Sequence, residues 1–389
     1  MADKVFTKNF ILMFVSNLLI CIGFYMLMPV LPVYAVHNLN ISNDIVGLIV
    51  GVFAFSAVLV RPFAGILVDN IGRMAIYIPA LIIFALCSLG YAFAASIIGL
   101  LLFRIFHGVA WSGVSTANSA IVADIVPISV RGQGMGYFGL SMTIAMALGP
   151  ALGVYLIDKL SYFNIFIICS SISFTALFVS IFVRPPKYEI KKIKLSITSL
   201  FEKRVLGLSL IQYFYGFASS SVMTFAVLHG VDRNIAGIGY YYLIFAIFVS
   251  IVRTFGGKIL DKKGPALFLY SGHLIYMLGC LLLAFSYSSV PFLISAALTG
   301  FGAGLIMPTL MMMMVNLVTP NRRGAASATV LSAMDIGVGT GAISMGYVAH
   351  IFGYDGMYIF AAIVFIIPLL WFFFYEQAHY NSIYNSMKN

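Results

Sequence analysis

The feature that most constrains this chain is a series of long apolar segments that carry almost no charge. The first segment, from Phe10 to Val36, contains no Asp, Glu, Lys, Arg or His. At about 1.5 Å per residue, a helix of this length exceeds a hydrocarbon core of about 30 Å. The segment is also longer than the apolar region of a signal peptide, which has about 7–15 residues. We therefore expect a transmembrane helix that is retained.

The composition extends this conclusion to the whole chain. Of 389 residues, 62% are hydrophobic and 9% are charged, whereas about 25% of residues are charged in a typical soluble domain. A soluble fold of this size could not hide so much apolar surface, because its own exterior needs polar cover. We predict an all-α integral membrane protein of twelve transmembrane helices. The expected spans are residues 8–36, 45–68, 74–95, 97–123, 132–158, 164–184, 205–230, 235–260, 265–286, 290–318, 324–351 and 356–375.

The net charge of +10 comes from basic residues that gather at every second helix junction, as at Arg131 and Arg253. The opposite junctions carry little beyond Lys159 and Arg233. This positive-inside pattern predicts a multi-pass protein of the cell membrane, with both termini and residues 185–204 in the cytoplasm. A basic surface for nucleic acid would not alternate with the helices, so we expect the lipid bilayer as a partner and no nucleic acid.

An internal repeat with an offset of 192 residues divides the chain into two halves. Four positions of the first half recur in the second: Arg61, Gly65, Asp69 and Gly72 return as Arg253, Gly257, Asp261 and Gly264. The same offset relates Gly108 to Gly300 and Gly149 to Gly341. Because six helices lie between the copies, both halves have the same orientation in the membrane, as parallel repeats about an axis along its normal.

The repeat therefore predicts two pseudo-symmetric bundles of six helices. The first bundle is expected over residues 1–184 and the second over residues 205–389, which includes a short cytoplasmic tail. Residues 185–204 are Lys-rich and contain two prolines, which is typical of a cytoplasmic linker near anionic headgroups.

Short motifs in the first half resemble those of a known family. The segment between the second and third expected helices contains Gly65, Asp69, Gly72 and Arg73, with Met74 after them. This pattern resembles the loop signature of the major facilitator superfamily, in which a basic residue usually stands at the position of Met74. The resemblance extends over nearly the whole chain and implies the major facilitator fold.

Three further motifs resemble the twelve-helix drug:proton antiporters of that superfamily. In helix 4, Arg104 and Gly108 match the arginine motif, with His107 where the family usually has Gln. In helix 5, Gly149, Pro150 and Gly153 match the antiporter motif, although Ala145 and Val154 replace common glycines. In helix 1, Gly23, Pro29 and Pro32 match the drug-export branch.

The resemblance implies a gate at the cytoplasmic side of the two bundles. Its expected residues are Gly65, Asp69, Arg73, Arg131, Asp261 and Arg323. Gly65 would let helix 2 approach a neighbour closely, and Asp69 could then accept hydrogen bonds from the N-terminus of a facing helix. Alternatively, Asp69 and Arg73 are ordinary loop charges. The kink expected at Pro150 likewise has a purely structural explanation beside an antiporter role.

Ionisable residues inside the membrane are costly and often mark function. Arg104 and His107 begin a polar stripe on helix 4 that continues through Trp111, Ser115 and Asn118. We interpret the stripe as the lining of a wet cavity; hydrogen bonding between helices without solvent is the alternative. Asp335 is the only carboxylate deep in an apolar run, near the expected midplane.

These three ionisable residues, Asp335, His107 and Arg104, are the candidates for proton coupling. A carboxyl group or an imidazole can bind and release a proton, whereas Arg104 can act only through its charge. The candidate residues of the substrate cavity are Tyr25, Trp111, Asn118, Gln212, Tyr215 and Met311. Met and aromatic side chains can re-pack around different ligands, but lipid-facing or core packing is the better explanation for any single one of them.

The sequence and the resemblance together predict a secondary active transporter that works by alternating access. The resemblance implies proton-coupled export of amphipathic small molecules, either drugs or metabolites. Expected helix 1 has no Asp or Glu, so with Arg104 and His107 in the stripe the site favours neutral, zwitterionic or anionic substrates. A proton-coupled uptake symporter or a facilitator would share the fold and most motifs.

Other classes of protein fit less well. An enzyme would need a catalytic cluster, and the sequence contains no HExxH motif and no Ser/His/Asp group at one depth. A receptor that does not transport would leave the repeated loop signature unexplained. The four cysteines stand alone in apolar stretches without metal-ligand spacing, so we expect no cofactor and no metal. The expected partners are a small-molecule substrate and protons, and the expected state is a monomer.

Overall fold

The computed structural model describes residues 5–127, 130–186, 202–318 and 323–388, and every regular element in them is a helix. The chain divides into two compact units. Unit 1 comprises residues 1–41 and 52–195, and unit 2 comprises residues 42–51 and 196–389. The boundaries expected for the two bundles and the linker stay a prediction.

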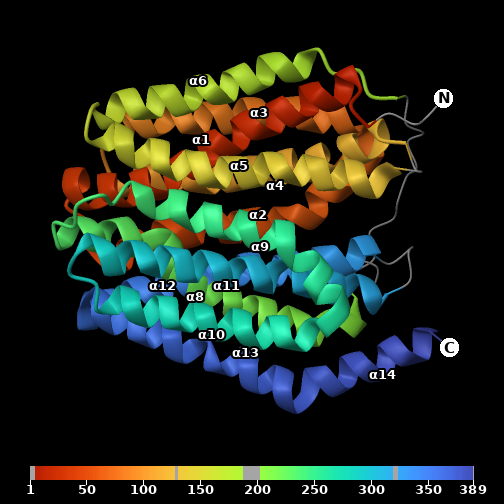
Figure 1. Ribbon diagram of the computed structural model, residues 1–389. Coiled ribbons are helices and arrows are strands. Elements are labelled where there is room, and N and C mark those ends of the chain that lie inside the picture. The colour runs from red at the N-terminus through yellow and green to blue at the C-terminus, as the bar shows by residue number, and fades with distance from the viewer. Residues whose placement is uncertain (1–4, 128–129, 187–201, 319–322, 389) are drawn as a thin grey trace. The chain divides into compact units, whose positions relative to one another are not determined.

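Six long helices run side by side in unit 1 (Figure 1). They are α1 (Lys8–Leu39), α2 (Asn43–Ile71, whose first turns group with unit 2), α3 (Arg73–Gly90), α4 (Ile97–Ile125), α5 (Arg131–Ile157) and α6 (Tyr162–Ile181), with a short 3₁₀ turn η1 (Tyr91–Phe93). Hydroxyl side chains start three of them: Thr7, Ser96 and Ser161 each accept a hydrogen bond from a first-turn backbone N–H. Helix α1 is central, since it packs against α4, α5 and α6.

Unit 2 repeats this plan and adds a longer C-terminal end. Its elements are η3 (Lys203–Val205), α8 (Leu206–Asp232), α9 (Tyr240–Lys263), α10 (Pro265–Ala284), α11 (Ser289–Asn316), α12 (Arg323–Val364), α13 (Ile366–Trp371), a π-helical turn η5 (Phe372–Glu376) and α14 (Gln377–Lys388). Helix α8 packs along α12, and α11 packs against α9 and α10.

Ten helices in the described residues are long and apolar enough to cross a membrane. The expected count of twelve therefore stays a prediction. Two features account for the lower number: the apolar part of α9, Tyr240–Arg253, is shorter than the others, and a single apolar stretch runs from Ala326 to Tyr384. That stretch contains a backbone break at Gly353, whose φ of 69° is in the left-handed region that favours glycine. The break lies between the expected spans 324–351 and 356–375.

The sequence repeat is also a repeat of helix packing. In unit 1, a Cβ added to Gly108 would overlap the backbone oxygen of Phe53, and in unit 2 a Cβ on Gly300 would overlap that of Phe245. Both members of the pair are shifted by the same 192 residues. The two glycines thus bring α4 against α2 and α11 against α9, with backbones in direct contact, as is common between membrane helices.

Two further pairs of repeated glycines are also required by the structure, one by close helix contact and one by backbone conformation. A Cβ on Gly149 would lie 2.7 Å from the Cβ of Tyr25, and one on Gly341 would overlap the backbone of Phe217, which is the repeat equivalent of Tyr25. At the other end, Gly72 and Gly264 precede α3 and α10 with φ of 123° and 78°. A side chain at either position would be strained, so the glycine of the loop signature is required by the backbone in both units.

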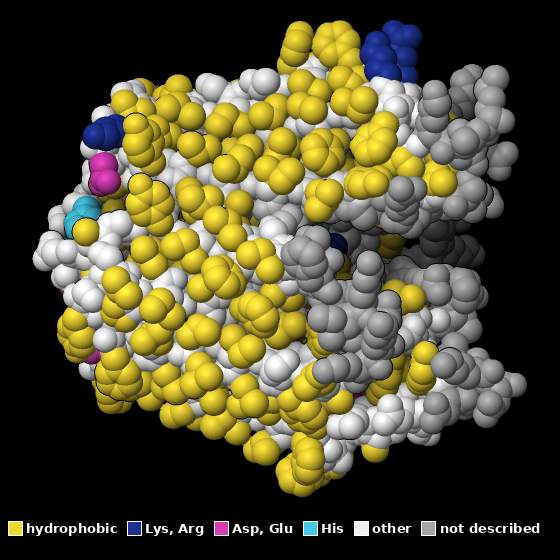
Figure 2. Space-filling view, viewed as in Figure 1, with side chains coloured by type: hydrophobic (Ala, Val, Ile, Leu, Met, Phe, Trp, Pro, Cys, Tyr) yellow, Lys and Arg dark blue, Asp and Glu magenta, His cyan; other side chains and the backbone are white. Residues whose placement is uncertain are grey.

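The outer surface is apolar along the helices. Figure 2 shows a face on which most described side chains are hydrophobic and few are charged. Large apolar side chains such as Leu59, Phe63 and Phe178 are 70%, 56% and 63% exposed. Such exposure over whole helices is the pattern of a protein whose solvent is lipid.

Candidate functional site

Arg104 and His107 lie one turn apart on α4 and are both buried in unit 1. Arg104 is 3% exposed, and its guanidinium carbon lies 4.3 Å from the centre of the Phe53 ring, within cation–π range. His107 is fully buried, and its Nδ1 lies 2.8 Å from the hydroxyl of Tyr91. Helix α4 therefore carries a cation and an imidazole into the interior of an apolar bundle.

Aromatic rings enclose the imidazole of His107. The rings of Phe84 and Phe53 lie 4.1 Å and 5.6 Å from it, centre to centre, both edge to face. Its Nε2 has no hydrogen-bond partner in the described part of the chain. Since Nδ1 is occupied by Tyr91, Nε2 is the atom through which this histidine could exchange a proton.

The C-terminal part of the predicted stripe, Trp111 and Asn118, connects α4 to other helices of unit 1. Trp111 stacks on Phe24 of α1, with 4.6 Å between ring centres and 11° between planes. The Nδ2 of Asn118 donates to Oδ1 of Asn17 at 2.6 Å, and the Nδ2 of Asn17 donates to Ser141 on α5 at 2.6 Å. These contacts correspond to the alternative interpretation of the stripe as hydrogen bonding between helices; its role as a cavity lining stays a prediction.

The helix 5 motif positions α5 against α1. Gly149 lies against Tyr25, which is 5% exposed, and Gly153 lies against the backbone oxygen of Met26, 2.6 Å from a built Cβ. Pro150 lies inside α5, which continues unbroken to Ile157. The motif thus provides a closely packed seam between two helices of unit 1.

The loop signature forms an ion pair that the sequence analysis missed. Arg73, at the start of α3, pairs with Asp124 near the end of α4, with 2.6 Å between Nε and Oδ2. A Cβ built at Gly65 meets no described atom within 4 Å. The close approach of a neighbouring helix at Gly65 stays a prediction. The side chains of Asp69 and of three further gate residues lie outside the described part: Asp261, Arg131 and Arg323. The backbones of Arg131 and Arg323 begin α5 and α12.

The candidate residues of unit 2 lie on three helices. Gln212 on α8 donates from Nε2 to the sulfur of Met307 on α11 at 3.0 Å. Tyr215, one turn further, packs against Tyr276 with 5.8 Å between ring centres. Met311 on α11 and Asp335 on α12 are half-buried. The structure therefore links Gln212 to α11, and it gives Asp335 a position on α12 that is neither fully buried nor exposed.

Sequence reasoning also missed a buried carboxyl group near the C-terminus. Glu376 is 2% exposed, and its Oε2 occupies the place where a side chain of Gly207 would begin. Its Oε1 has no hydrogen-bond partner among the described residues. The expected last helix ended at residue 375, so Glu376 was assigned to the tail; the helix instead continues through a π-helical turn into α14.

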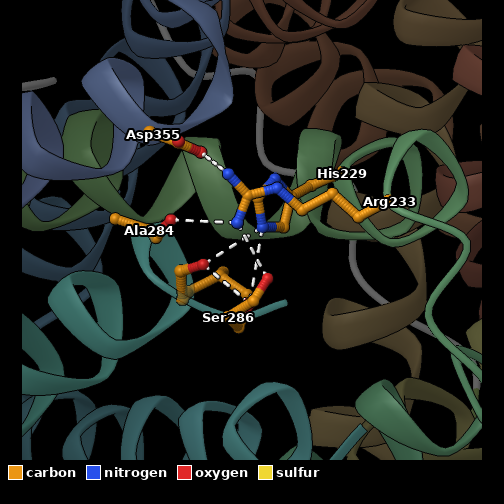
Figure 3. Close-up of polar contacts among 6 residues, drawn as sticks. His229, Arg233, Ala284, Ser286 and Asp355 are labelled. Carbon is orange, nitrogen blue, oxygen red and sulfur yellow. Dashed lines mark hydrogen bonds and ion pairs between the residues drawn. The ribbon is translucent and has the colours of Figure 1, made fainter. Parts of the chain in front are cut away.

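A third group missed by the sequence analysis is a polar cluster at the end of α8 (Figure 3). Arg233 donates from Nη1 to the backbone oxygens of Ala284 at 3.2 Å and Ser286 at 2.8 Å, and it forms an ion pair with Asp355. His229 directs Nε2 at the oxygen of Leu283 at 3.1 Å; a carbonyl only accepts, so Nε2 carries the proton. The cluster satisfies carbonyls at the C-terminus of α10 and stabilises that helix end.

The sequence profile of the Major Facilitator Superfamily matches residues 13–289 and 268–385. The chain belongs to the major facilitator superfamily. It is therefore a multi-pass membrane transporter.

Two curated relatives of this major facilitator transporter are export proteins by name. The staphylopine export protein of Staphylococcus aureus is 24% identical over 86% of this chain and 88% of its own length. A multi-drug resistance efflux pump PmrA homolog of Lactococcus lactis is 24% identical over 94% of both chains. Among solved structures, the human organic anion transporter MFSD10 superposes with a TM-score of 0.72 at 18% identity, over 94% of this chain and 98% of that one. At that identity the superposition shows a shared fold.

Proposed function

We propose that this transporter exports amphipathic small molecules by alternating access and that proton uptake drives the export. Twelve membrane spans, a monomeric state and cytoplasmic termini complete the proposal. The names of the two export relatives and the helix 5 motif support the direction. The alternation of basic residues along the chain supports the orientation in the cell membrane.

The observation that carries the proposal is the pair Arg104 and His107, buried together on α4. A charged side chain at the centre of a bilayer costs roughly 2.5–3.5 kcal/mol on insertion scales. Residues that carry such a cost usually serve a transported substrate or a coupling ion. A bundle that needed only to fold would be more stable with apolar residues at these two positions.

The two residues suggest different roles. The guanidinium of Arg104 keeps its proton, so its contribution is a fixed positive charge that attracts carboxylate or phosphate groups. The imidazole of His107 can gain and lose a proton, and the carboxyl group of Asp335 in unit 2 can do the same. We therefore propose zwitterionic or anionic amphiphiles as substrates and Asp335 or His107 as the proton carrier.

The test uses purified protein in proteoliposomes with norfloxacin, a zwitterionic amphiphile, as the probe. Proton-driven transport under an imposed pH gradient is compared with norfloxacin exchange at equal pH. Asp335→Asn should abolish the first and preserve the second. If Asp335→Asn keeps proton-driven transport and His107→Ala loses it, the carrier is His107.

The direction of transport needs a separate measurement. Inverted membrane vesicles with an acidic lumen should accumulate norfloxacin in the wild type. Accumulation only in right-side-out vesicles would indicate an uptake symporter, and movement that ignores the proton gradient would indicate a facilitator. Either result would overturn proton-driven export.

A further inference from the structure

Glu376 occupies an unusual position for an acid. The residues before it on the same π-helical turn, Phe373, Phe374 and Tyr375, are 62%, 63% and 62% exposed, whereas Glu376 is 2% exposed. Three exposed aromatic side chains place this turn at the level of the membrane. Glu376 shares the inner face of the turn with Phe372, which is also 2% exposed, and is therefore removed from lipid and water.

The carboxyl group lies against the backbone at the start of α8. Its Oε2 and Cδ fill the space that a Cβ at Gly207 would need, so only glycine fits at that position while Glu376 keeps this place. The first turn of a helix presents unpaired backbone N–H groups and a partial positive charge. Glu376 is thus both removed from water and close to a helix end that tolerates an anion.

The turn that carries Glu376 is anchored on its C-terminal side. The hydroxyl of Tyr270 on α10 donates to Oε1 of Gln377 at 2.9 Å, and Nδ2 of Asn316 on α11 donates to the hydroxyl of Tyr380 at 2.9 Å. These two bonds hold the beginning of α14 against α10 and α11 of the same unit. The π-helical turn, a form found often at functional sites, keeps Glu376 on the same inner face.

A second buried acid, five residues before Gly207 in the chain, provides a contrast. Glu202, just before η3, is 8% exposed, but its Oε1 accepts a hydrogen bond from the backbone N–H of Arg204 at 3.3 Å. Glu376 has no such donor for Oε1. A buried carboxylate without donors is expensive, and a proton on the carboxyl group removes that cost.

Few ionisable side chains lie on the elements that contact the turn of Glu376. The π-helical turn packs against α8, α13 and α14. The first turn of α8 and the whole of α13 contain no ionisable side chain. Lys203 and Arg204 precede α8 and are exposed, His379 on α14 is exposed, and the hydroxyl of Tyr380 accepts from Asn316.

We propose that the carboxyl group of Glu376 is a proton-binding site of this transporter. Its O–H bond breaks when the π-helical turn and the start of α8 separate, and the proton passes to water at that end of the helices. The carboxylate that remains is stabilised by the exposed Lys203 and Arg204 and by the N-terminus of α8. Return of the proton restores the buried arrangement. As a step of coupled transport, the site rests on the function proposed above; as a titrating group it stands by itself.

The experiment uses three variants of the full-length protein in proteoliposomes. Glu376→Gln copies the protonated form in shape and charge, Glu202→Gln is the matched control, and Gly207→Ala displaces the carboxyl group without removing it. Infrared difference spectra between acidic and alkaline buffer report the carbonyl band of protonated carboxyl groups. Glu376→Gln should remove one pH-dependent band, Gly207→Ala should shift it, and Glu202→Gln should leave it in place.

Transport provides the second readout. With norfloxacin as the probe, Glu376→Gln should lose its response to a pH gradient and keep exchange at equal pH, while Glu202→Gln should behave as wild type. If Glu376→Gln keeps every pH-dependent carbonyl band of the wild type, the inference is overturned, whatever the transport result. If the wild type itself ignores the pH gradient, the proposed function fails, and the infrared result alone decides whether Glu376 binds a proton.

Discussion

Arg73 and Asp124 form an ion pair that connects the first residue of α3 to the last turn of α4, with 2.6 Å between Nε and Oδ2. The side chains are 13% and 21% exposed, so the pair is shielded from water without being fully buried. In unit 2, the repeat places Pro265 and Asn316 at these positions, and Asn316 donates to Tyr380 instead. The equivalent positions of unit 2 thus carry no charge, and the ion pair is a feature of unit 1.

The pair predicts coupling between the two charges. Asp124→Asn and Arg73→Gln should each lower thermal stability in detergent, and the double variant should cost less than the sum of the two. We expect a coupling free energy of roughly 1 kcal/mol, the upper end for pairs that water partly screens. A thermal unfolding series of the four proteins measures it, and strictly additive losses would contradict the pair.

The same asymmetry predicts a difference between the two acids of the repeated loop. Asp69→Asn should impair transport while expression is largely retained, because the signature in unit 1 includes Arg73 and Asp124. Asp261→Asn should be milder, because Pro265 and Asn316 stand in unit 2 where unit 1 has the ion pair of Arg73 and Asp124. The measurement is norfloxacin transport normalised to protein in the membrane. If Asp69→Asn transports as well as the wild type, the acid of the motif has no role in transport.

An added methyl group should lower the folding stability at one glycine of unit 1 and leave it unchanged at another. Gly108→Ala would force the backbone of α4 away from Phe53, and overpacking of this kind costs about 1–3 kcal/mol. Gly65→Ala has free space within 4 Å and should fold as wild type in thermal unfolding. If Gly65→Ala folds normally but does not transport, the glycine is required in a conformation other than this one.

Single cysteines test the orientation of the helix ends. All four native cysteines are buried, so they should react slowly with reagents from water. Asn38→Cys, at an exposed position on the last turn of α1, should react with a membrane-impermeant thiol reagent in whole cells, and Lys203→Cys should not. Asn38 is preferable to Asn40, whose φ of 51° would strain a cysteine by about 1–2 kcal/mol. Reversed labelling would contradict the proposed orientation.

Much of the fold could be predicted because it depends on properties that are local in sequence. Apolar length predicted the helices within a few residues, as for the expected span 97–123 and the observed α4 (Ile97–Ile125). The glycine and charge pattern at one offset predicted the repeat, which Gly108 and Gly300 confirm as a repeat of packing. Membership of the major facilitator superfamily was likewise predicted from short motifs, and the match of the family profile confirms it.

The site could be predicted less well, because partners distant in sequence decide what a polar residue does. Nothing near Asp124 in the sequence identifies Arg73 as its partner. Glu376 follows a run of aromatic residues and reads as the start of a polar tail, and only the missing side chain of Gly207 makes room for it inside the bundle. In the same way, the sequence shows Arg233 only as one of the few basic residues at the opposite junctions, and its contacts with Asp355 and α10 depend on the fold.

The hydrogen-bonded chain from Asn118 through Asn17 to Ser141 cross-links three helices of unit 1. Sliding α1, α4 and α5 past one another would break both bonds, and lipid offers no water to replace them. The repeat equivalents of Asn17, Asn118 and Ser141 in unit 2 are Ser209, Leu310 and Ala333. The hydroxyl of Ser209 donates to the backbone oxygen of Val205, directly before α8. The links of unit 2 lie about one turn further along α8, where Gln212 donates to the sulfur of Met307 on α11 and Thr340 of α12 donates to the hydroxyl of Tyr213. Both halves are therefore cross-linked between their own helices, so deformation during a transport cycle should spare the interior of each half, and a ligand that loosens these bonds should impair transport.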